Sequence, residues 1–252
     1  MYRSLDATRI TDTVSLLERR VAERFPGSGL SKVAAEVTGV AQQAMKVTAE
    51  IDRPNLLLRA VCGVVIVVIA TAITATMAEL RLAPGEWTWV AAIPVLESVI
   101  NELVLLGAGL FFLITLESRI KRGRALKAIH ELRSLAHIID MHQLTKDPHG
   151  MLEGGTVTPN SPARKLTPYE LSRYLDYCTE MLSLIGKLAA LYVQRFDDPV
   201  ALAAVDGMED LTTGLSRKIW QKIAMIEAAA RTDRLMGKPP EPQIGSSGPG
   251  ET

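Results

Sequence analysis

Two long apolar runs occupy the middle of the chain. Residues 60–78 contain no charged side chain over nineteen positions. At 1.5 Å per residue this run would span about 28 Å as a helix, close to the thickness of a bilayer's hydrocarbon core. The second run, residues 103–116, reaches spanning length only if its helix begins near Leu96. The pattern predicts two membrane spans, at about residues 58–79 and 96–116. A pair of buried helices in a soluble bundle is the disfavoured alternative, because such helices usually keep one polar face.

Apolar positions at three- and four-residue spacing flank both runs, as expected for helices with one buried face. They predict helices at about residues 11–25, 30–52, 167–192 and 199–235, and a second span that continues without a stop signal to about Lys146. Pro26 to Gly29 separates the first two helices, and the series Thr167-Pro168-Tyr169-Glu170 forms a capping box. No run with the two-residue period of a strand occurs.

These elements predict an all-α membrane protein, a transmembrane helical hairpin with a cytoplasmic antiparallel helical bundle. The predicted divisions are a cytoplasmic N-terminal helical hairpin (1–54), the transmembrane hairpin (55–118), a cytoplasmic helical bundle (119–236) and a disordered tail (237–252). The long second helix has the coiled-coil type of apolar spacing, which requires partner helices.

Basic residues near the spans predict the orientation. Lys46, Arg53 and Arg59 precede the first span, and five basic residues follow the second, whereas the loop between Glu79 and Leu96 holds Arg81 as its one basic residue. Both termini are therefore expected in the cytoplasm, with the loop between the spans on the outer side of the membrane. Trp87 and Trp89 would lie at the outer headgroups.

The overall composition excludes few functions. The 252 residues have a net charge of zero, two cysteines and 5% aromatic residues, which gives no indication of nucleic-acid binding or of a disulfide framework. No glycine-rich phosphate loop, nucleophile elbow or metal-ligand motif occurs. We expect no cofactor.

Polar residues within or beside the spans are the first candidate site. Glu97, Asn101 and Glu102 fall in the outer part of the second span, and Thr74 has a similar depth in the first. Ionisable groups in a membrane usually face protein or water, so Glu102 is expected to face the first span near Thr74 or Thr71. Alternatively, the second helix begins later and these residues stay among the headgroups.

The four histidines lie close together in the sequence, and His130, His137 and Asp140 form a second candidate, a switch or a metal site. No His-x3-His pair closes a metal site on one helix, so solvated or packing histidines are the favoured alternative. A third candidate is a lipid-headgroup site, or otherwise only a topology signal, formed by Arg119, Lys121, Arg122, Arg124 and Lys127.

Three segments carry a resemblance to a known group of proteins. They are RALKAIHELRSLAHIIDMHQLTKDP, RRVAERFPGSGL and IDRPNLLLR. With them the chain resembles bacterial two-span inner-membrane proteins. The resemblance implies a bacterial inner membrane and the same topology, and it carries over no functional residue.

We therefore expect a non-enzymatic bacterial inner-membrane protein that presents a cytoplasmic helical interaction, scaffold or sensor domain. Its expected partners are membrane lipids and either another protein or further copies of itself. The first alternative is an oligomeric channel or transport accessory protein that uses Glu97, Asn101 and Glu102. The last is a metal-dependent hydrolase that uses His130, His137 and Asp140.

Overall fold

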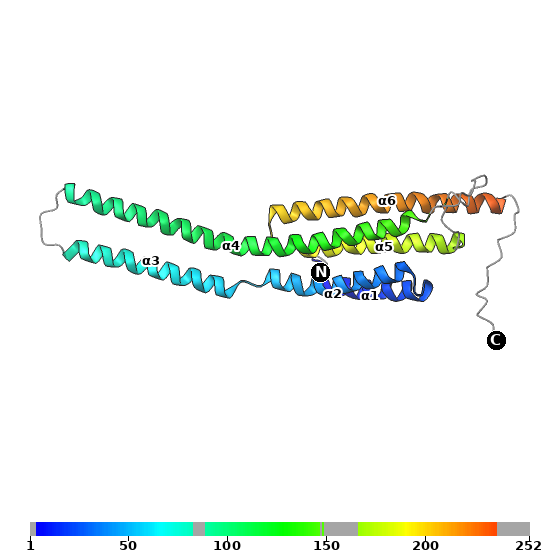
Figure 1. Ribbon diagram of the computed structural model, residues 1–252, viewed down its shortest axis with the longest axis horizontal. Helices are drawn as coiled ribbons and strands as arrows, with labels where there is room; N and C mark the ends of the chain where they lie inside the picture. Colours follow the sequence, from blue (N-terminus) through cyan, green and yellow to red (C-terminus); the bar gives the residue numbers. More distant parts are fainter. Residues whose placement is uncertain (1–3, 83–88, 147, 149–165, 236–252) are drawn as a thin grey trace. The chain divides into compact units, whose positions relative to one another are not determined.

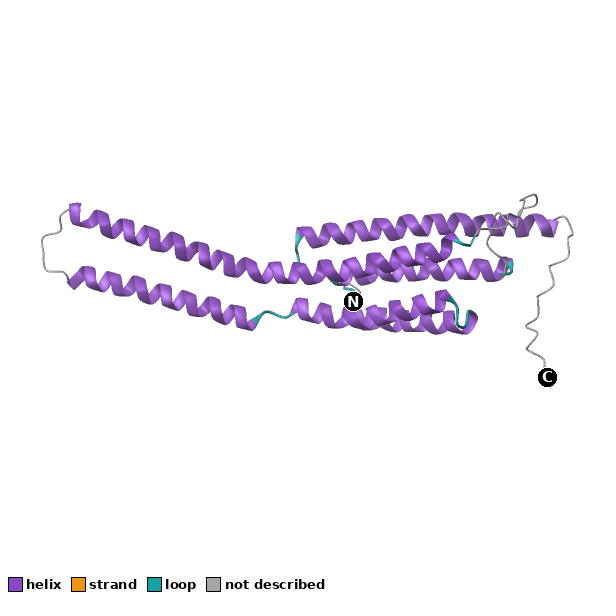
Figure 2. Ribbon diagram, in the orientation of Figure 1, coloured by secondary structure: helices purple, strands orange, loops and turns teal. Residues whose placement is uncertain are grey.

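The computed structural model describes residues 4–82, 89–146, 148 and 166–235, and these residues form six α-helices and no strand (Figures 1 and 2). The all-α prediction is confirmed for this part of the chain. The helices are α1 (Ala7–Arg24), α2 (Gly29–Asp52), α3 (Leu56–Leu82), α4 (Trp89–Leu144), α5 (Pro168–Leu191) and α6 (Pro199–Leu235). Trp87, most of the connection after Lys146 and the tail predicted at 237–252 lie outside the described residues.

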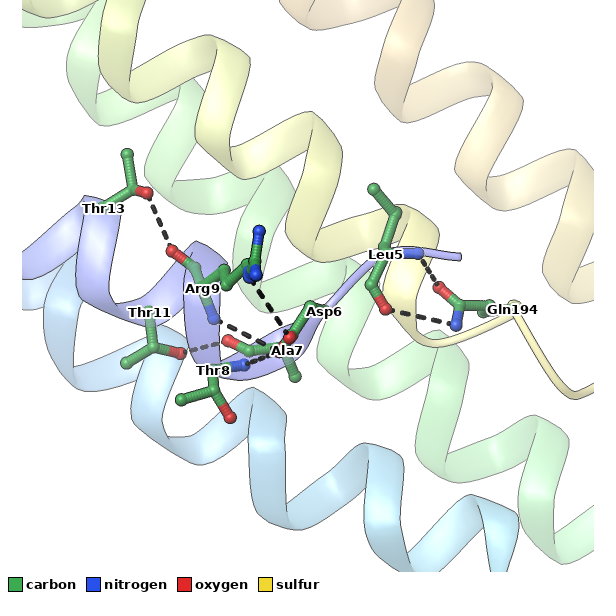
Figure 3. Close-up of polar contacts among 8 residues, drawn as sticks. All are labelled: Leu5, Asp6, Ala7, Thr8, Arg9, Thr11, Thr13 and Gln194. Carbon is green, nitrogen blue, oxygen red and sulfur yellow. Dashed lines mark hydrogen bonds and ion pairs between the residues drawn. The ribbon is translucent and has the colours of Figure 1, made fainter. Parts of the chain in front are cut away.

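Short polar side chains fix where several helices begin. The carboxylate of Asp6 accepts hydrogen bonds from the backbone N–H groups of Thr8 (2.9 Å) and Arg9 (3.3 Å), as Figure 3 shows. Thr167 and Glu170 form the predicted capping box before α5. Asp198 caps α6 in the same way as Asp6 caps α1. Each cap satisfies N–H groups that have no partner within the helix.

The turn between α1 and α2 follows the proline and glycine signals of the sequence. Gly27 has a φ of 66°, in the left-handed region that glycine adopts without steric cost. The Ser28 hydroxyl then accepts from the backbone N–H of Ser31 at 3.1 Å and caps α2.

The chain divides into two compact units, which are described separately. Unit 1 consists of Met1–Thr48 and Leu126–Thr252, and unit 2 is Ala49–Ala125. Unit 1 therefore contains α1, most of α2, the second part of α4, α5 and α6. Unit 2 contains α3 and the first part of α4.

In unit 1 the core is centred on α5. All seven residues of its predicted apolar stripe are buried: Leu171, Tyr174, Cys178, Met181, Ile185, Leu188 and Tyr192. The opposite side is buried as well, through Leu175, Tyr177, Leu182 and Leu184. The stripe predicted for α1 is buried too, whereas Leu202 of the α6 stripe is exposed. α5 is therefore the central helix, not one helix of an outer ring.

Polar contacts join the other helices of unit 1 at their ends. The Lys222 ammonium on α6 donates to the carbonyls of Gln143 (2.9 Å) and Lys146 (3.1 Å), where α4 ends. The Gln143 carbonyl also accepts from the backbone N–H of Lys146 at 3.0 Å, in the turn that follows the helix, and a cation interacts favourably with a helix C-terminus. Lys222 therefore closes the end of α4.

Close packing at glycines differs from the expectation in part. Gly207 of α6 lies close to Arg133, since an added Cβ would be 3.3 Å from Nη2 of that arginine. Gly214, which we also expected at a close contact, has nothing within 4 Å of such a Cβ. The same is true of Gly63 and Gly109 in unit 2. Among the described residues, neither glycine therefore marks a close helix contact.

In unit 2, two helices are long and apolar enough to cross a membrane, and none of their most apolar stretch is buried inside the protein. Exposed apolar side chains follow both helices, including Val64, Val67, Leu105 and Phe111. α3 continues to Leu82 and α4 begins at Trp89, so the connecting loop is shorter than the predicted Glu79–Leu96. Both helices therefore extend further towards the connection than predicted.

The prediction of a continuous second helix is confirmed. α4 runs for 56 residues without a break and ends two residues before the predicted Lys146. It passes through Gly123, which is exposed and has nothing within 4 Å of an added Cβ. Its helical course also includes Glu97, Asn101 and Glu102, so the alternative of a helix that begins after them is wrong.

Candidate functional site

An open groove of about 530 Å³ crosses unit 1 where α1, α5 and α6 meet. Its lining residues are Thr13, Thr179, Glu180, Ser183, Leu184, Lys187, Ser216 and Trp220. Its apolar lining residues are the buried Leu184 and the exposed Trp220, and the other six lining residues are polar.

Trp220 is the exposed large apolar side chain of this groove, with 59% of its surface accessible. Tryptophan is enriched among the residues that contribute most to the binding energy of protein interfaces. Leu16, also exposed, lies one helical turn from Thr13 on α1. Together they place apolar area on two of the helices that border the groove.

Most polar groups of the lining are already engaged inside the protein. The Thr13 hydroxyl donates to the carbonyl of Arg9 at 2.7 Å (Figure 3). Glu180 accepts two hydrogen bonds from the guanidinium group of Arg20, at 2.8 and 3.2 Å. The Lys187 ammonium donates to the Ser183 hydroxyl at 2.7 Å and, among the described residues, meets no carboxylate within 4 Å. The Lys187 ammonium is therefore placed where it could contact an anionic group of a binding partner.

Charged residues form a second cluster at the end of unit 2 where α3 begins. The carboxylate of Glu117 on α4 lies 3.1 Å from Nζ of Lys121 and 3.6 Å from Nε of Arg59. It also accepts from the backbone N–H of Asn55 at 3.4 Å. Because Arg59 and Asn55 come from the start of α3, Glu117 connects the two helices at this end.

The environment of Glu117 favours its charged form. Burial alone would raise the pKa of the Glu117 carboxyl group. The hydrogen bonds from Lys121 and Asn55, with the positive charges of Lys121 and Arg59, outweigh burial, so the pKa lies below its usual value. The sequence analysis named Arg59 only as a topology signal and missed Glu117 and the contact between them. The signal was Glu117 four residues before Lys121, a spacing that allows an ion pair on one helix.

The five predicted headgroup residues differ in their contacts. Lys121 pairs with Glu117, and Arg124 pairs with Glu50 at 3.4 Å. Arg119 and Lys127 are exposed. Arg122 also interacts within the protein. Lipid binding by this group remains a prediction, and the exposed side chains are the ones best placed for it.

The structure describes the side chains of three of the four intramembrane candidates, Glu97, Asn101 and Thr74. Glu97 and Asn101 are exposed and lie four residues apart on α4. Thr74 is exposed and donates its hydroxyl to the carbonyl of Thr71 at 2.9 Å, within its own helix. The side chain of Glu102 lies outside the described residues, so its predicted contact with Thr74 or Thr71 stays a prediction.

The histidine candidates lie on the unit 1 part of α4. His130 and His137 are exposed, and Asp140 accepts a hydrogen bond from Gln143 at 2.7 Å. Among the described residues, no three His, Cys, Asp or Glu side chains come together in a way that could hold a metal ion. His142 packs instead on Gly29 at the start of α2.

Comparisons with known proteins add no assignment: no protein-family model, no curated protein and no solved structure matches this chain.

Proposed function

We propose that the protein is a membrane-anchored binding protein. Unit 2 would span a bacterial inner membrane as a helical hairpin with both termini in the cytoplasm, and unit 1 would bind a protein partner there. The exposed apolar side chains of α3 and α4 support the anchor, because such surfaces are stable when lipid covers them.

The observation that carries the binding role is the groove between α1, α5 and α6, with Trp220 exposed at its edge. Its length along α5, from Thr179 to Lys187, corresponds to about 12 Å of helix, or just over two turns. A partner helix with one apolar face fits such a groove, since it can place a large apolar side chain beside Trp220 and Leu184. Lys187 favours a partner that brings a carboxylate close to it.

The proposal is tested by photo-crosslinking in native membranes. A benzophenone amino acid at Ser216, beside Trp220 in the groove, should give an adduct with one partner protein. The same group at Met141, an exposed position on α4, is the matched control and should not give that adduct. The partner segment, once identified and synthesised, should bind the purified full-length protein.

Substitutions in the groove decide whether that binding uses the proposed surface. Trp220→Ala should weaken binding of the segment by at least tenfold, equivalent to about 1.4 kcal/mol, because interface tryptophans dominate binding energy. Met141→Ala should leave it unchanged. An adduct with the mass of two copies of this chain, or equal affinity for the wild type and Trp220→Ala, would contradict the proposal.

A channel or transport accessory remains a second candidate because of Glu97 and Asn101. Both are exposed on the apolar part of α4, where an exposed polar group is costly unless it faces protein or water. Two helices cannot enclose a path, so this function requires several copies. Ion flux through liposomes that contain the purified protein, reduced by Glu97→Gln, would favour it. No observation among the described residues favours the metal-dependent hydrolase.

A further inference from the structure

The end of unit 1 where α1 finishes and α5 begins carries a cluster of arginine and aromatic side chains. The guanidinium carbons of Arg173 and Arg20 lie 4.8 and 5.3 Å from the ring centre of Tyr177. The guanidinium group of Arg24 lies 5.5 Å from the ring centre of Tyr169. The three arginines thus converge on two tyrosines of α5.

Aromatic packing holds this cluster in place from below. Phe25 meets Tyr174 and Tyr177 edge to face, with ring centres 5.5 and 6.3 Å apart. The Lys146 ammonium lies 5.0 Å from the ring centre of Tyr174. Edge-to-face pairs and cations over ring faces are both favourable arrangements. Packing against Phe25 therefore holds in place the Tyr177 ring that Arg20 and Arg173 contact.

The charges of the cluster do not balance. Arg20 is paired with Glu180 through two hydrogen bonds, and Arg173 is paired with Asp176. No carboxylate of the described residues is within 4 Å of Arg24. Of the three arginines, Arg24 is therefore the one without an ion pair among the described residues.

The unbalanced charge is also the accessible one. Arg24 is exposed, and Tyr169 beneath it keeps 61% of its surface accessible. Tyr177 is only 2% exposed, so an incoming group would meet Arg24 and the half-buried Arg173 first. A guanidinium group presents parallel N–H donors that match the oxygens of a phosphate or carboxylate.

From this arrangement we propose that Arg24 and Arg173, seated on Tyr169 and Tyr177, form a binding site for a phosphoryl-bearing anion. The site is separate from the groove that carries the proposed partner. Arg20 does not belong to it, because both of its terminal nitrogens donate to Glu180, whereas Arg173 donates to Asp176 through Nη1 alone. A phosphoryl group suits the site best, since its three oxygens can accept from two guanidinium groups at once.

Tyr177 provides a signal for occupation of the site. Burial alone would raise the pKa of the Tyr177 hydroxyl, but its hydrogen bonds with Arg173 and Arg24 and the positive charges of Arg173 and Arg20 outweigh burial, so the pKa is lowered. An anion bound to these arginines would weaken their hold on the phenolate. The pKa of Tyr177 should then rise towards its ordinary value.

The test uses the full-length protein in nanodiscs of zwitterionic lipid, with pyrophosphate as the probe. Equilibrium dialysis gives its affinity, and absorbance at 295 nm against pH, as the difference between the wild type and Tyr177→Phe, follows the phenol. Arg24→Gln should weaken pyrophosphate binding about tenfold, the loss expected for one charge-assisted contact. Arg217→Gln, at an exposed arginine of α6, is the matched control and should bind as the wild type does.

The two measurements distinguish an anion-binding site from a cluster that only joins α1 to α5. Weaker binding by Arg24→Gln alone, with a higher Tyr177 pKa when pyrophosphate saturates the wild type, supports the site. Equal binding by both variants, or an unmoved Tyr177 pKa, would overturn it and leave the arginines with the sole task of joining α1 to α5. Repeating dialysis in nanodiscs with anionic phospholipid identifies the source. If the lipid competes with pyrophosphate the natural ligand is a headgroup, and if it does not the ligand is a soluble phosphate compound.

Discussion

Lys187 and Lys222 lie on neighbouring helices, and their ammonium groups have different tasks. Lys222 donates to two carbonyls at the end of α4. Lys187 bonds to Ser183, one turn earlier on its own helix. The same residue type therefore closes a helix in one place and leaves a charge at a groove in the other. Only the packing of α4 against α6 distinguishes them.

Two glycines should respond to alanine with opposite signs. Gly214→Ala should stabilise the protein by about 0.5–1 kcal/mol, because alanine restricts the unfolded chain and favours a helix interior, and nothing lies within 4 Å of the new methyl group. Gly29→Ala should destabilise it by about 1 kcal/mol or more, because the methyl group would lie 2.5 Å from Cε1 of His142. Thermal unfolding followed by circular dichroism in detergent measures both changes.

The double variant Gly29→Ala, His142→Ala tests the cause of that loss. Removing the imidazole frees the space that the new methyl group needs, so the double variant should be no less stable than His142→Ala alone. Additive losses would show that Gly29 is required for the backbone and not for the contact.

At this scale the sequence predicts which residues are buried better than which residues meet. The stripe on α1 is buried as its spacing predicts, because it depends on one helical face. Gly207 and Gly214 carry the same signal, yet only Gly207 has a close neighbour, Arg133. The neighbour comes from a distant helix, and single-sequence spacing contains no information about it.

At the scale of elements, α5 shows the same limit. Its N-terminus and its apolar stripe follow from Thr167, Pro168 and the three- and four-residue spacing. Its central position does not, because Tyr177 and Thr179 are buried although their polar groups suggest a solvated side. The burial of two sides of α5 results from α1 and α6 packing on it together, whereas Ser183 and Lys187 stay exposed.

The contact between α3 and α4 at Glu117 should be sensitive to acid. A carboxyl group whose pKa is lowered by folding stabilises the folded state above its unfolded pKa, near 4.5, and loses that contribution as pH falls through the lower folded value. Wild-type stability should therefore fall as the pH drops below about 4.5. Thermal unfolding from pH 3 to pH 7 measures it.

Glu117→Gln isolates this contribution. The variant should be less stable than the wild type at pH 7, and the difference should shrink as the pH falls through the lowered folded pKa, where the wild-type carboxyl group becomes protonated too. Glu36→Gln, at an exposed residue of α2, is the control. It should change neither the stability at pH 7 nor the dependence of stability on pH. A constant difference across the pH range would contradict the role assigned to Glu117.

The continuity of α4 can be tested at Gly123 without disturbing a packed side chain. Gly123→Ala should make the helix more rigid, whereas Gly123→Pro should interrupt it at a cost of about 3 kcal/mol or more, through a lost hydrogen bond and a clash with the preceding turn. Amide hydrogen exchange over residues 117–130 should slow in the first variant and accelerate in the second. Slow exchange in Gly123→Pro would mean that the segment does not need an unbroken helix.

At the scale of the whole molecule, the hydrophobic surface decides the environment of unit 2. Its apolar side chains are exposed along α3 and α4, and the hydrophobic effect opposes contact between so much apolar area and water. The two apolar runs of the sequence already predict this exposed apolar surface, because a candidate membrane span is recognised from composition and length alone. The groove and the arginine cluster of unit 1 could not be predicted, since each combines residues from helices far apart in the chain.

The orientation of the hairpin is the last prediction, and it rests on the basic residues that flank both spans. A cysteine at Gly85, between the spans, should react with an impermeant thiol reagent in intact cells, and one at Ser246 should react only after the cells are opened.

The protein into which these cysteines are introduced needs only the substitution Cys62→Ala. Cys178 can stay, because it is fully buried and burial raises the pKa of its thiol to about 12, so the reactive thiolate is scarce. Retaining Cys178 also avoids a cavity in the centre of α5, which Cys178→Ala would create. Labelling at Ser246 but not at Gly85 in intact cells would show the opposite orientation. The groove, with any partner that binds it, would then lie outside the cytoplasm.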